Sequence, residues 1–232
     1  MSILLNTPPL NVQENMALDE QVVRLRPQAV TLRFYHWTAA PAVTFGYAQF
    51  IQEVRKAIQQ RHFSGAYARR PTGGGVVFHR DDLTFSLVFP SQAAPTEIYR
   101  QLHAAVLEQL RENGLMVRVF DATLPASVYA PSQAGGATAC FVRPVQNDLL
   151  ADDGQKILGG AIRRFANTIL YQGSLQMPGA RENPLFKRSV IEAVRRFLAV
   201  DLRPAACGAD RLAGVRQLAV DKYSSLAWTE KF

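Results

Sequence analysis

Two short groups of residues combine side chains that can do chemistry with glycines that expose the main chain, and a single cysteine is a third candidate. The first group is Arg69-Arg70, followed after two residues by Gly73-Gly74-Gly75. Three consecutive glycines remove the Cβ atoms that would hold a ligand away from the backbone, and the arginines place positive charge beside them. The group predicts a loop that binds an anionic or carbonyl-bearing ligand. A flexible turn flanked by solvated arginines is the alternative.

This loop matches neither common phosphate-binding motif. Dinucleotide-binding loops need G-x-G-x-x-G at the start of a helix, and P-loops need G-x-x-x-x-G-K-S/T. Here the glycines are contiguous and lead into Val76-Val77-Phe78, which favours a strand. His79 ends that strand, where it can act as an acid or base or support the loop.

The second group is a turn followed by a lysine and a glycine pair. Asp153-Gly154 is typical of a hairpin turn, and Lys156 then precedes Gly159-Gly160-Ala161. A lysine ammonium has three donors, and backbone N–H groups at Gly160 and Ala161 can stabilise an oxyanion. The alternative is an ordinary turn with an exposed strand lysine.

The third candidate is Cys140, which follows a long segment rich in Ala, Pro, Ser and Gly. A nearby ammonium such as Lys156 would favour its thiolate, the nucleophilic form of cysteine. The alternative is a buried, inert thiol. Cys207 lacks this context, and two irregularly spaced cysteines predict neither a disulfide framework nor a metal site. No G-x-S-x-G motif is present, so a Ser-His-Asp triad has no support.

Composition narrows the class of protein. The 232 residues suit one α/β domain, and 26 Lys and Arg against 19 Asp and Glu give a net charge of +7. This dispersed excess favours an acidic protein partner over nucleic acid. The N-terminus lacks the basic and apolar regions of a signal peptide, and no apolar run is long enough to span a membrane. We expect a cytoplasmic protein with no membrane partner.

Hydrophobic periodicity predicts the elements that must position these residues. Helices are expected over residues 12–26, 50–62, 95–113, 184–198 and 212–224, and strands over 31–37, 43–47, 66–70, 76–79, 83–89, 148–151 and 156–176. The glycine loop therefore lies within a sheet.

In this order, the motifs resemble the lipoate-protein ligase A and octanoyltransferase family, which shares its catalytic fold with biotin protein ligases. The matching segments are Asn15-Met16-Ala17-Leu18-Asp19-Glu20, Arg69 to Gly75, Asp82-Leu83-Thr84-Phe85-Ser86, Lys156 to Ala161, Gln172-Gly173-Ser174-Leu175, and Lys222-Tyr223-Ser224-Ser225 with Trp228. The resemblance implies an α/β (α+β) fold with mixed, largely antiparallel sheets packed with helices, in one catalytic domain over residues 1–232.

The resemblance also implies an activity, the attachment of an octanoyl or lipoyl group to a lysine of a lipoyl domain. Such domains occur in the E2 subunit of 2-oxoacid dehydrogenases and in the glycine-cleavage H protein. Ligases of the family adenylate free lipoate with ATP and Mg²⁺. Transferases need no cofactor, because they take octanoate from acyl carrier protein through a cysteine thioester.

Features of both branches are present. Cys140-Phe141 resembles the transferase nucleophile. Ligases of the family commonly carry a C-terminal accessory domain, and we expect none here, which favours a transferase. Gly75 and Asn147-Asp148-Leu149-Leu150 resemble the ligase branch instead, and Gly160 stands where the family more often has serine. We favour a transferase, with an ATP-dependent ligase, a non-catalytic lipoate-binding protein and a biotin ligase as alternatives.

The predicted site follows from these motifs. The catalytic residues are Cys140 and Lys156, and the substrate-binding residues are Arg70, Gly73, Gly74, Gly75, His79, Gly159, Gly160 and Ala161.

Overall fold

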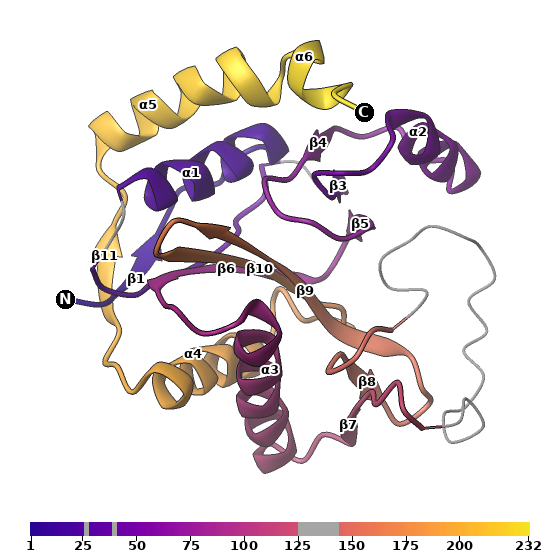
Figure 1. Cartoon of the computed structure of the whole chain (residues 1–232), viewed down its shortest axis with the longest axis vertical. Coiled ribbons are helices and arrows are strands. Elements are labelled where there is room, and N and C mark those ends of the chain that lie inside the picture. Colours follow the sequence, from indigo (N-terminus) through magenta and orange to yellow (C-terminus); the bar gives the residue numbers. More distant parts are fainter. Residues whose placement is uncertain (26–27, 39–40, 125–143) are drawn as a thin grey trace.

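A computed structural model describes residues 1–25, 28–38, 41–124 and 144–232 (Figure 1). The predicted nucleophile Cys140 lies outside the described residues, as does most of the segment before it. In chain order the elements are β1 (Ile3–Asn6), α1 (Val12–Arg24), β2 (Thr31–Phe34), β3 (Ala42–Phe45), α2 (Ile51–Gln60), β4 (Tyr67–Arg69), β5 (Val76–His79), β6 (Leu83–Pro90), α3 (Pro95–Glu112), β7 (Val117–Val119), β8 (Leu149–Ala151), β9 (Lys156–Phe165), β10 (Thr168–Leu175), α4 (Pro184–Leu198), β11 (Arg203–Ala206), α5 (Ala209–Leu218), the π-helical turn η2 (Ala219–Tyr223) and α6 (Leu226–Thr229).

The described residues form two β-sheets. The larger sheet has eight strands in the order β11-β1-β2-β6-β10-β9-β8-β7, and the smaller sheet has three in the order β4-β3-β5. The pairs β1–β11, β1–β2 and β3–β4 are parallel, and the other pairs are antiparallel. The predicted α/β class with mixed, largely antiparallel sheets is confirmed.

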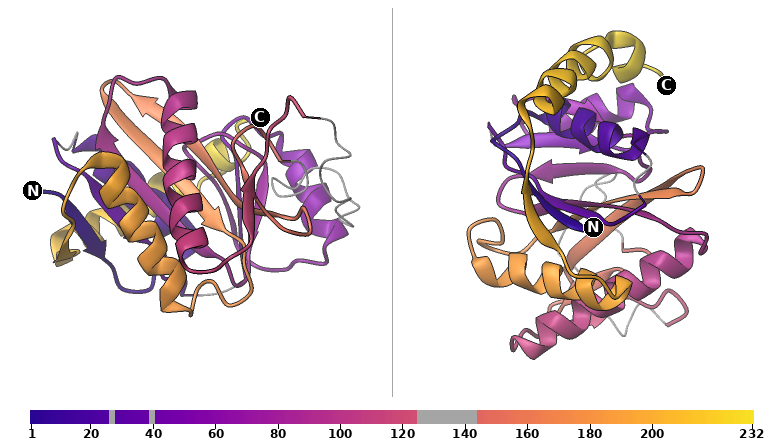
Figure 2. Two further views of the ribbon diagram at one scale, coloured as in Figure 1. Left: turned by 90° about the horizontal axis from the view of Figure 1, so that it is seen from below. Right: turned by 90° about the vertical axis from the view of Figure 1, so that its left-hand side faces the viewer.

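Helices cover both faces of the large sheet (Figures 1 and 2). On one face, α3 and α4 pack against alternate residues of the central strand β6, including Phe85, Leu87 and Phe89. Val88 points to the opposite face, where it joins a second core formed with α1 and α5. Because side chains alternate across a strand, β6 is buried on both sides. Most of its apolar side chains face α3 and α4, and the buried polar residues Thr84 and Ser86 lie on the other face with Val88. Within the described residues, no helix combines the length and the apolar character needed to cross a bilayer.

Helix α1 begins at a capping box that fixes its entry into the fold. The Asn11 side chain accepts a hydrogen bond from the Glu14 N–H at 2.8 Å, and the Glu14 carboxylate accepts one from the Asn11 N–H at 2.9 Å. These bonds satisfy two backbone donors that would otherwise lack partners at the start of the helix. The cap sets the axial position of α1, and with it the places of Met16 and Asp19.

Several elements differ from the sequence-based prediction. The strands β1, β7 and β11 were not predicted, because each is short and β11 contains Pro204, which an edge strand tolerates. The segment predicted as strand over residues 156–176 is two strands joined at Ala166, which adopts a φ of 52°. The last predicted helix begins earlier and passes into η2.

The π-helical turn brings two consecutive residues onto one carboxylate of α1. Lys222 Nζ lies 2.6 Å from Glu20 Oε2, and the Tyr223 hydroxyl donates to the same oxygen at 2.5 Å. Burial alone would raise the pKa of Glu20, but Lys222 and Tyr223, together with Arg24, hold this pKa below its ordinary value of 4.5. The charged form of Glu20 therefore fastens the C-terminal segment to α1.

This attachment predicts a specific loss of stability in acid. Because the Glu20 pKa is lower in the folded protein, its contribution is complete above the unfolded pKa and disappears as the pH falls through the folded pKa. We expect Glu20→Gln to lower the free energy of unfolding by about 1–3 kcal/mol at neutral pH and to flatten its decline towards acid. Urea unfolding at about pH 7 and about pH 4 measures both effects.

The matched control is Glu112→Gln, which removes an exposed carboxylate paired with Arg196. Exposed pairs contribute little, so this variant should behave like the wild type at both pH values. Equal pH dependence in the wild type and Glu20→Gln would refute the role of Glu20.

Candidate active site

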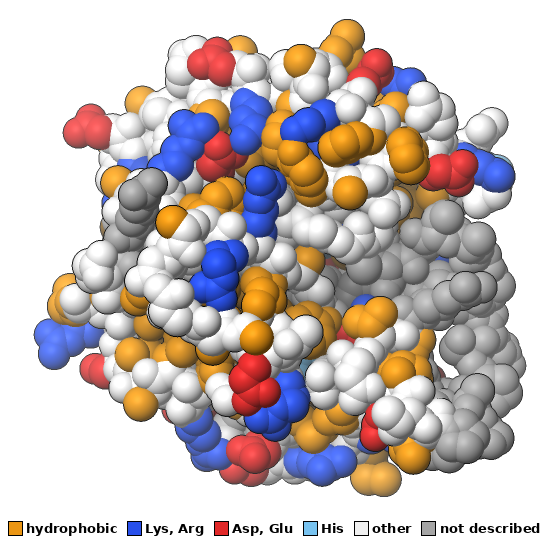
Figure 3. All heavy atoms as spheres, in the orientation of Figure 1, with side chains coloured by type: hydrophobic (Ala, Val, Ile, Leu, Met, Phe, Trp, Pro, Cys, Tyr) orange, Lys and Arg blue, Asp and Glu red, His pale blue; other side chains and the backbone are white. Residues whose placement is uncertain are grey.

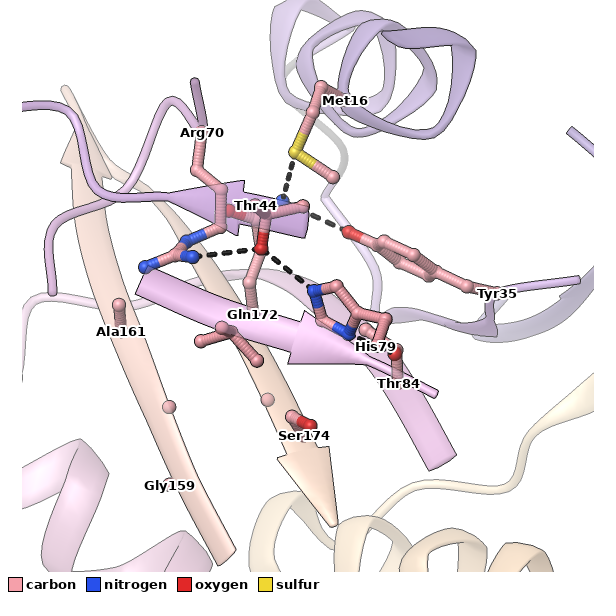
Figure 4. A pocket seen from close by; sticks show the side chains of 13 residues that line it. Met16, Tyr35, Thr44, Arg70, His79, Thr84, Gly159, Ala161, Gln172 and Ser174 are labelled. Atoms are coloured by element: carbon pink, nitrogen blue, oxygen red, sulfur yellow. Dashed lines mark hydrogen bonds between the residues drawn. The ribbon is translucent and has the colours of Figure 1, made fainter. Parts of the chain in front are cut away.

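A pocket lies between the two sheets, beside the first half of α1 (Figure 4). About 410 Å³ of space lies in and at the mouth of the pocket, part of it open to solvent. The lining residues are Met16, Tyr35, Thr44, Arg70, Val77, His79, Thr84, Gly159, Gly160, Ala161, Gln172, Gly173 and Ser174. The fold thus brings the predicted residues Arg70, His79, Gly159, Gly160 and Ala161 to one cavity.

Arg70 holds the glycine loop in shape. Its Nη2 donates to the carbonyl oxygens of Gly73 and Gly75 at 2.8 and 3.0 Å, and its Nη1 donates to Thr44 Oγ1 at 2.8 Å. The residue is buried, with 6% of its surface exposed. The positive charge therefore meets the loop carbonyls from inside the fold.

His79 continues this chain of hydrogen bonds from Arg70 (Figure 4). Its Nε2 lies 2.8 Å from Thr44 Oγ1, and its Nδ1 lies 2.9 Å from Asp82 Oδ2. Since Thr44 accepts from Arg70, its own hydroxyl hydrogen is available to His79 Nε2, and a neutral His79 then carries its proton on Nδ1. Both ring nitrogens are occupied, so in this arrangement His79 positions Thr44 and Arg70.

Asp82 is the last residue in this series of hydrogen bonds. Burial alone would raise the pKa of Asp82, but its contacts with His79, Ser174 and Thr84 hold that pKa below its ordinary value. Ser174 and Thr84 donate to Asp82 Oδ2 at 2.5 and 2.7 Å. An ionised Asp82 thus fixes the orientation of the His79 ring, and through Thr44 that of Arg70.

A second chain joins the loop to α1. Thr72 donates to Gln172 Oε1 at 2.6 Å, and Gln172 Nε2 donates to Asp19 Oδ2 at 2.6 Å. Asp19 also pairs with Arg33 at 2.7 Å, and both side chains are 1% exposed. Two independent polar chains therefore determine where the loop lies.

Backbone contact holds the loop at its glycines. The loop runs from β4 to β5, the two edges of the small sheet, and crosses the end of β3 at Gly46. A Cβ atom on Gly46 would lie only 1.9 Å from the Gly74 carbonyl oxygen, and Gly74 itself has a φ of 87°. Close approach explains glycine at position 46, and the positive φ explains it at position 74.

Arg69 has a different role from its neighbour. It is fully buried and donates to four backbone carbonyls, those of Tyr47, Gln49, Trp228 and Thr229. The Trp228 indole donates to the Arg69 carbonyl at 3.0 Å in return. Arg69 thus joins the C-terminal segment to the strand that leads into the glycine loop, and it contributes no charge to the pocket.

Lys156 lies behind the pocket wall as half of a buried ion pair. Its Nζ is 2.7 Å from Asp148 Oδ2, and the two side chains are 4% and 0% exposed. A register shift in the β8–β9 pairing between Leu149 and Leu150 marks a β-bulge next to this pair. A Cβ on Gly159 would lie 2.6 Å from Lys156 Nζ, so glycine lets the ammonium lie against the strand that lines the pocket.

Tyr99 connects this ion pair to the backbone of the pocket wall. Its hydroxyl donates to Asp148 Oδ1 at 2.5 Å and accepts from the Gly160 N–H at 3.0 Å. The Gly160 N–H, which the sequence suggested as an oxyanion donor, is therefore engaged by Tyr99 in this structure. Burial raises the pKa of Tyr99 well above its ordinary value, so the hydroxyl stays protonated and able to donate.

His103 on α3 supports the turn that carries Asp148. Burial lowers the pKa of His103 to about 3, so the ring is neutral near pH 7. Nδ1 lies 2.7 Å from the Asn147 carbonyl, and Nε2 lies 2.8 Å from the Tyr171 hydroxyl. A neutral ring donates at Nδ1 and accepts at Nε2, which matches both partners. His103 is thus a structural residue of α3.

Sequence reasoning missed four polar residues of the site, Thr44, Tyr99, Asp148 and Gln172, as functional candidates. Gln172 lies in a buried strand that also contains Thr168 and Ser174, so its type alone did not single it out. Thr44 had a recognisable signal, since it is a polar residue in an otherwise apolar buried strand. Such a residue needs a hydrogen-bond partner, and in a pocket wall that partner belongs to the site.

The packing of Gly46 against Gly74 predicts that Gly46→Ala displaces the glycine loop. We expect a loss of about 1–3 kcal/mol in the free energy of unfolding from the steric overlap, together with faster amide hydrogen exchange in residues 70–76. Hydrogen–deuterium exchange mass spectrometry measures the loop directly. Gly208→Ala is the control, because a Cβ there meets nothing within 4 Å. Unchanged exchange in the loop of Gly46→Ala would contradict this interpretation.

Comparison with known proteins identifies the family. The family model for the lipoyl protein ligase A/B catalytic domain matches residues 11–192. Octanoyltransferase LipM from Symbiobacterium thermophilum is 34% identical over 74% of this chain and 64% of its own length. The LipM proteins from Halalkalibacterium halodurans and Moorella thermoacetica are 32% and 30% identical, covering 69% and 92% of this chain and 60% and 79% of their own lengths.

Solved structures have the same fold. A putative lipoate protein ligase from T. acidophilum, Ta0514, superposes with a TM-score of 0.75 at 24% identity over all of both chains. A lipoate-protein ligase A bound with ATP gives a TM-score of 0.75 at 24% identity over 99% of both chains. From the family match and the sequence relatives together, this chain belongs to the lipoyl protein ligase A/B catalytic domain family.

Proposed function

We propose that this protein transfers an octanoyl group from octanoyl-acyl carrier protein to a lysine of a lipoyl domain, through a thioester on Cys140. The observation that carries the proposal is the buried Lys156–Asp148 pair, held at 2.7 Å against the glycine wall of the pocket between the two sheets. Such a pair is costly to bury, and a site that handles protons and developing charge is a reason to keep it. The similarity to relatives named octanoyltransferase supports the same activity.

Two acyl exchanges make up the reaction. First, the Cys140 thiolate attacks the donor thioester carbonyl, a new C–S bond forms, and the carrier leaves as its thiolate. Next, the amine of the target lysine attacks the Cys140 thioester, an amide forms, and the Cys140 thiolate leaves as the amine loses its proton. The first exchange replaces one thioester by another at little free-energy cost, whereas amide formation makes the second downhill.

In this scheme Lys156 and Asp148 serve both exchanges. The positive charge of the ammonium favours the thiolate form of a cysteine brought near it, and across the strand backbone it stabilises an oxygen that becomes negative. Asp148 holds the ammonium, and Tyr99 holds Asp148 in turn. Arg70 and His79 are assigned to shaping the substrate loop, with Gly73, Gly74 and Gly75 giving close access to its backbone.

The net positive charge of this protein suits partners with acidic docking surfaces, which we expect of the carrier protein and the lipoyl domain. The net charge is +7, and Lys and Arg side chains are spread over the face shown in Figure 3. Such a distribution accelerates association with an acidic protein without a single fixed docking stripe, and added salt should weaken it. A ligase from Thermoplasma acidophilum with the same fold has been solved as a lipoylation system with its E2 lipoyl domain.

ATP-dependent lipoate ligation is the second candidate function. It is favoured by Gly75 and by Asn147-Asp148-Leu149-Leu150, which resemble the ligase branch. In a ligase, Lys156 would hold phosphate or carboxylate oxygens of the adenylate, ATP and Mg²⁺ would supply the activation, and Cys140 would be a bystander. A protein that binds lipoate without catalysis is the remaining alternative.

Intact-mass spectrometry tests the thioester. After incubation with octanoyl-acyl carrier protein, we expect the protein mass to rise by one octanoyl group, and hydroxylamine should remove that group because it cleaves thioesters. Cys140→Ser should carry no hydroxylamine-labile adduct and should lose transfer to a lipoyl domain. Cys207→Ser is the matched control, since Cys207 is buried and burial raises the pKa of its thiol. Near-normal octanoyl transfer by Cys140→Ser would refute the mechanism, and modification of a lipoyl domain only with lipoate, ATP and Mg²⁺ would establish the ligase.

Removal of the Lys156 charge tests the proposed role of the ion pair. We expect Lys156→Met to lower kcat for octanoyl transfer by about 10²–10⁴-fold. Because this change leaves Asp148 buried and unpaired, it should also cost about 3–5 kcal/mol of stability. The double variant Lys156→Met/Asp148→Asn removes the orphan charge, so it should regain much of that stability without regaining transfer. Recovery of transfer in the double variant would show that Lys156 acts on the fold alone, and Lys56→Met serves as an exposed control.

A further inference from the structure

A second concave site adjoins the pocket between the two sheets, which is called the acyl pocket below after the proposed function. It is a groove between Gly74 of the glycine loop, the first turns of α3 at Thr96 and Tyr99, and the turn at Asn147, and it encloses about 880 Å³ of space open to solvent. Gly160 and Ala161 line both the groove and the acyl pocket. The groove and the pocket therefore meet at Gly160 and Ala161, in the strand that lies over Lys156.

The chemistry of the groove is neutral and polar. None of the described residues that line it carries a charged side chain. Its polar side chains are those of Thr96, Tyr99, Gln146 and Asn147. The Tyr99 hydroxyl is already bonded to Asp148 and Gly160, and the Gln146 amide oxygen accepts from the Ala122 N–H, which leaves the Thr96 hydroxyl and the side-chain amide groups for a ligand. Hydroxyls and amides pair well with amide and hydroxyl groups of a ligand, whereas a triphosphate is bound through cations and charge-assisted bonds. The lining suits an uncharged chain that bears amides.

Tyr99 connects the groove to the Lys156–Asp148 ion pair. Its hydroxyl donates to Asp148, the partner of Lys156, and accepts from the Gly160 N–H, while its side chain lines the groove. A ligand that fills both cavities would pass Gly160 and Ala161, so a bond at that junction would lie beside the ion pair.

We propose that this groove binds the amide-bearing arm of a pantetheine-type thioester donor, with the acyl chain in the pocket and the thioester at Gly160 and Ala161. The assignment rests on the proposed function and names the part of the donor that the protein recognises. Because the arm is neutral, recognition comes from hydrogen bonds and contact area, and affinity for the acyl donor exceeds that for the acyl chain alone.

Calorimetry with two unreactive thioethers tests the groove without any acyl transfer. S-octyl-pantetheine carries the arm, and octyl 2-hydroxyethyl sulfide has the same octyl chain without it. We expect the wild type to bind S-octyl-pantetheine about tenfold more tightly, a difference equal to one or two net hydrogen bonds. Thr96→Trp, which fills the groove from an exposed helix position, should bring the two Kd values within about twofold of each other. Gln101→Trp adds the same bulk to an exposed position of α3 outside the groove and should keep the difference.

Three results would overturn the assignment. These are equal affinity of the wild type for both thioethers, equal weakening of both by Thr96→Trp, and displacement of S-octyl-pantetheine by ATP. The outcomes for the groove and for the proposed function are separable. Arm-dependent binding without octanoyl transfer would refute the transferase and retain the groove, whereas octanoyl transfer with no arm preference would refute the groove alone.

Discussion

The side chain of Asp19 is 1% exposed, and a carboxyl group buried this deeply must be met by hydrogen-bond donors from the elements around it. Arg33 and Ser86 donate to one oxygen at 2.7 Å each, and Tyr35 and Gln172 donate to the other. The donors come from the central strands β6 and β10, from β2, and from the residue that follows β2. Because a lost donor leaves a buried charge short of a partner, α1 and the central strands keep one relative position. Gln172 extends this constraint to the glycine loop through Thr72.

In the glycine loop the buried charge is positive, because the Arg70 guanidinium donates hydrogen bonds to backbone carbonyl groups of the loop. Arg70 reaches Gly73 and Gly75 from within the fold, and Thr44 and His79 connect it to the buried Asp82. A glycine run has high conformational entropy when free, so an unclamped loop would be a poor binding surface. These hydrogen bonds restrict the conformations of the loop, while the glycines still leave its backbone open to close approach by a ligand. The loop is thus preorganised before any substrate binds, which lowers the cost of binding.

The sequence predicted the long, periodic elements well. Helices α1, α3 and α4 were predicted within two residues at most ends, because apolar spacing and capping residues such as Pro95 and Pro184 are local signals. The strands β1, β7 and β11 were missed because they are short and owe their pairing to partners distant in sequence, as for Ile3 and Arg203. Loop composition predicted that Arg70 and Gly160 would be at a site. It did not predict that Arg70 faces the loop's own carbonyls or that the Gly160 N–H is bound by Tyr99, since both depend on long-range contacts.

The two buried ion pairs of the site differ in a way that bears on its chemistry. Asp19 and Arg33 are satisfied on all sides by hydrogen bonds within the core, an arrangement that specifies structure. Lys156 and Asp148 instead lie against Gly159, where the absence of a side chain leaves only the strand backbone between the ammonium and the pocket. A pair meant only to hold β8 against β9 would be replaceable by apolar side chains at no cost in stability. The glycine, the bulge and the Tyr99 hydroxyl all help to place this one cation, and the acyl exchange that we propose would give a physical reason for keeping it there.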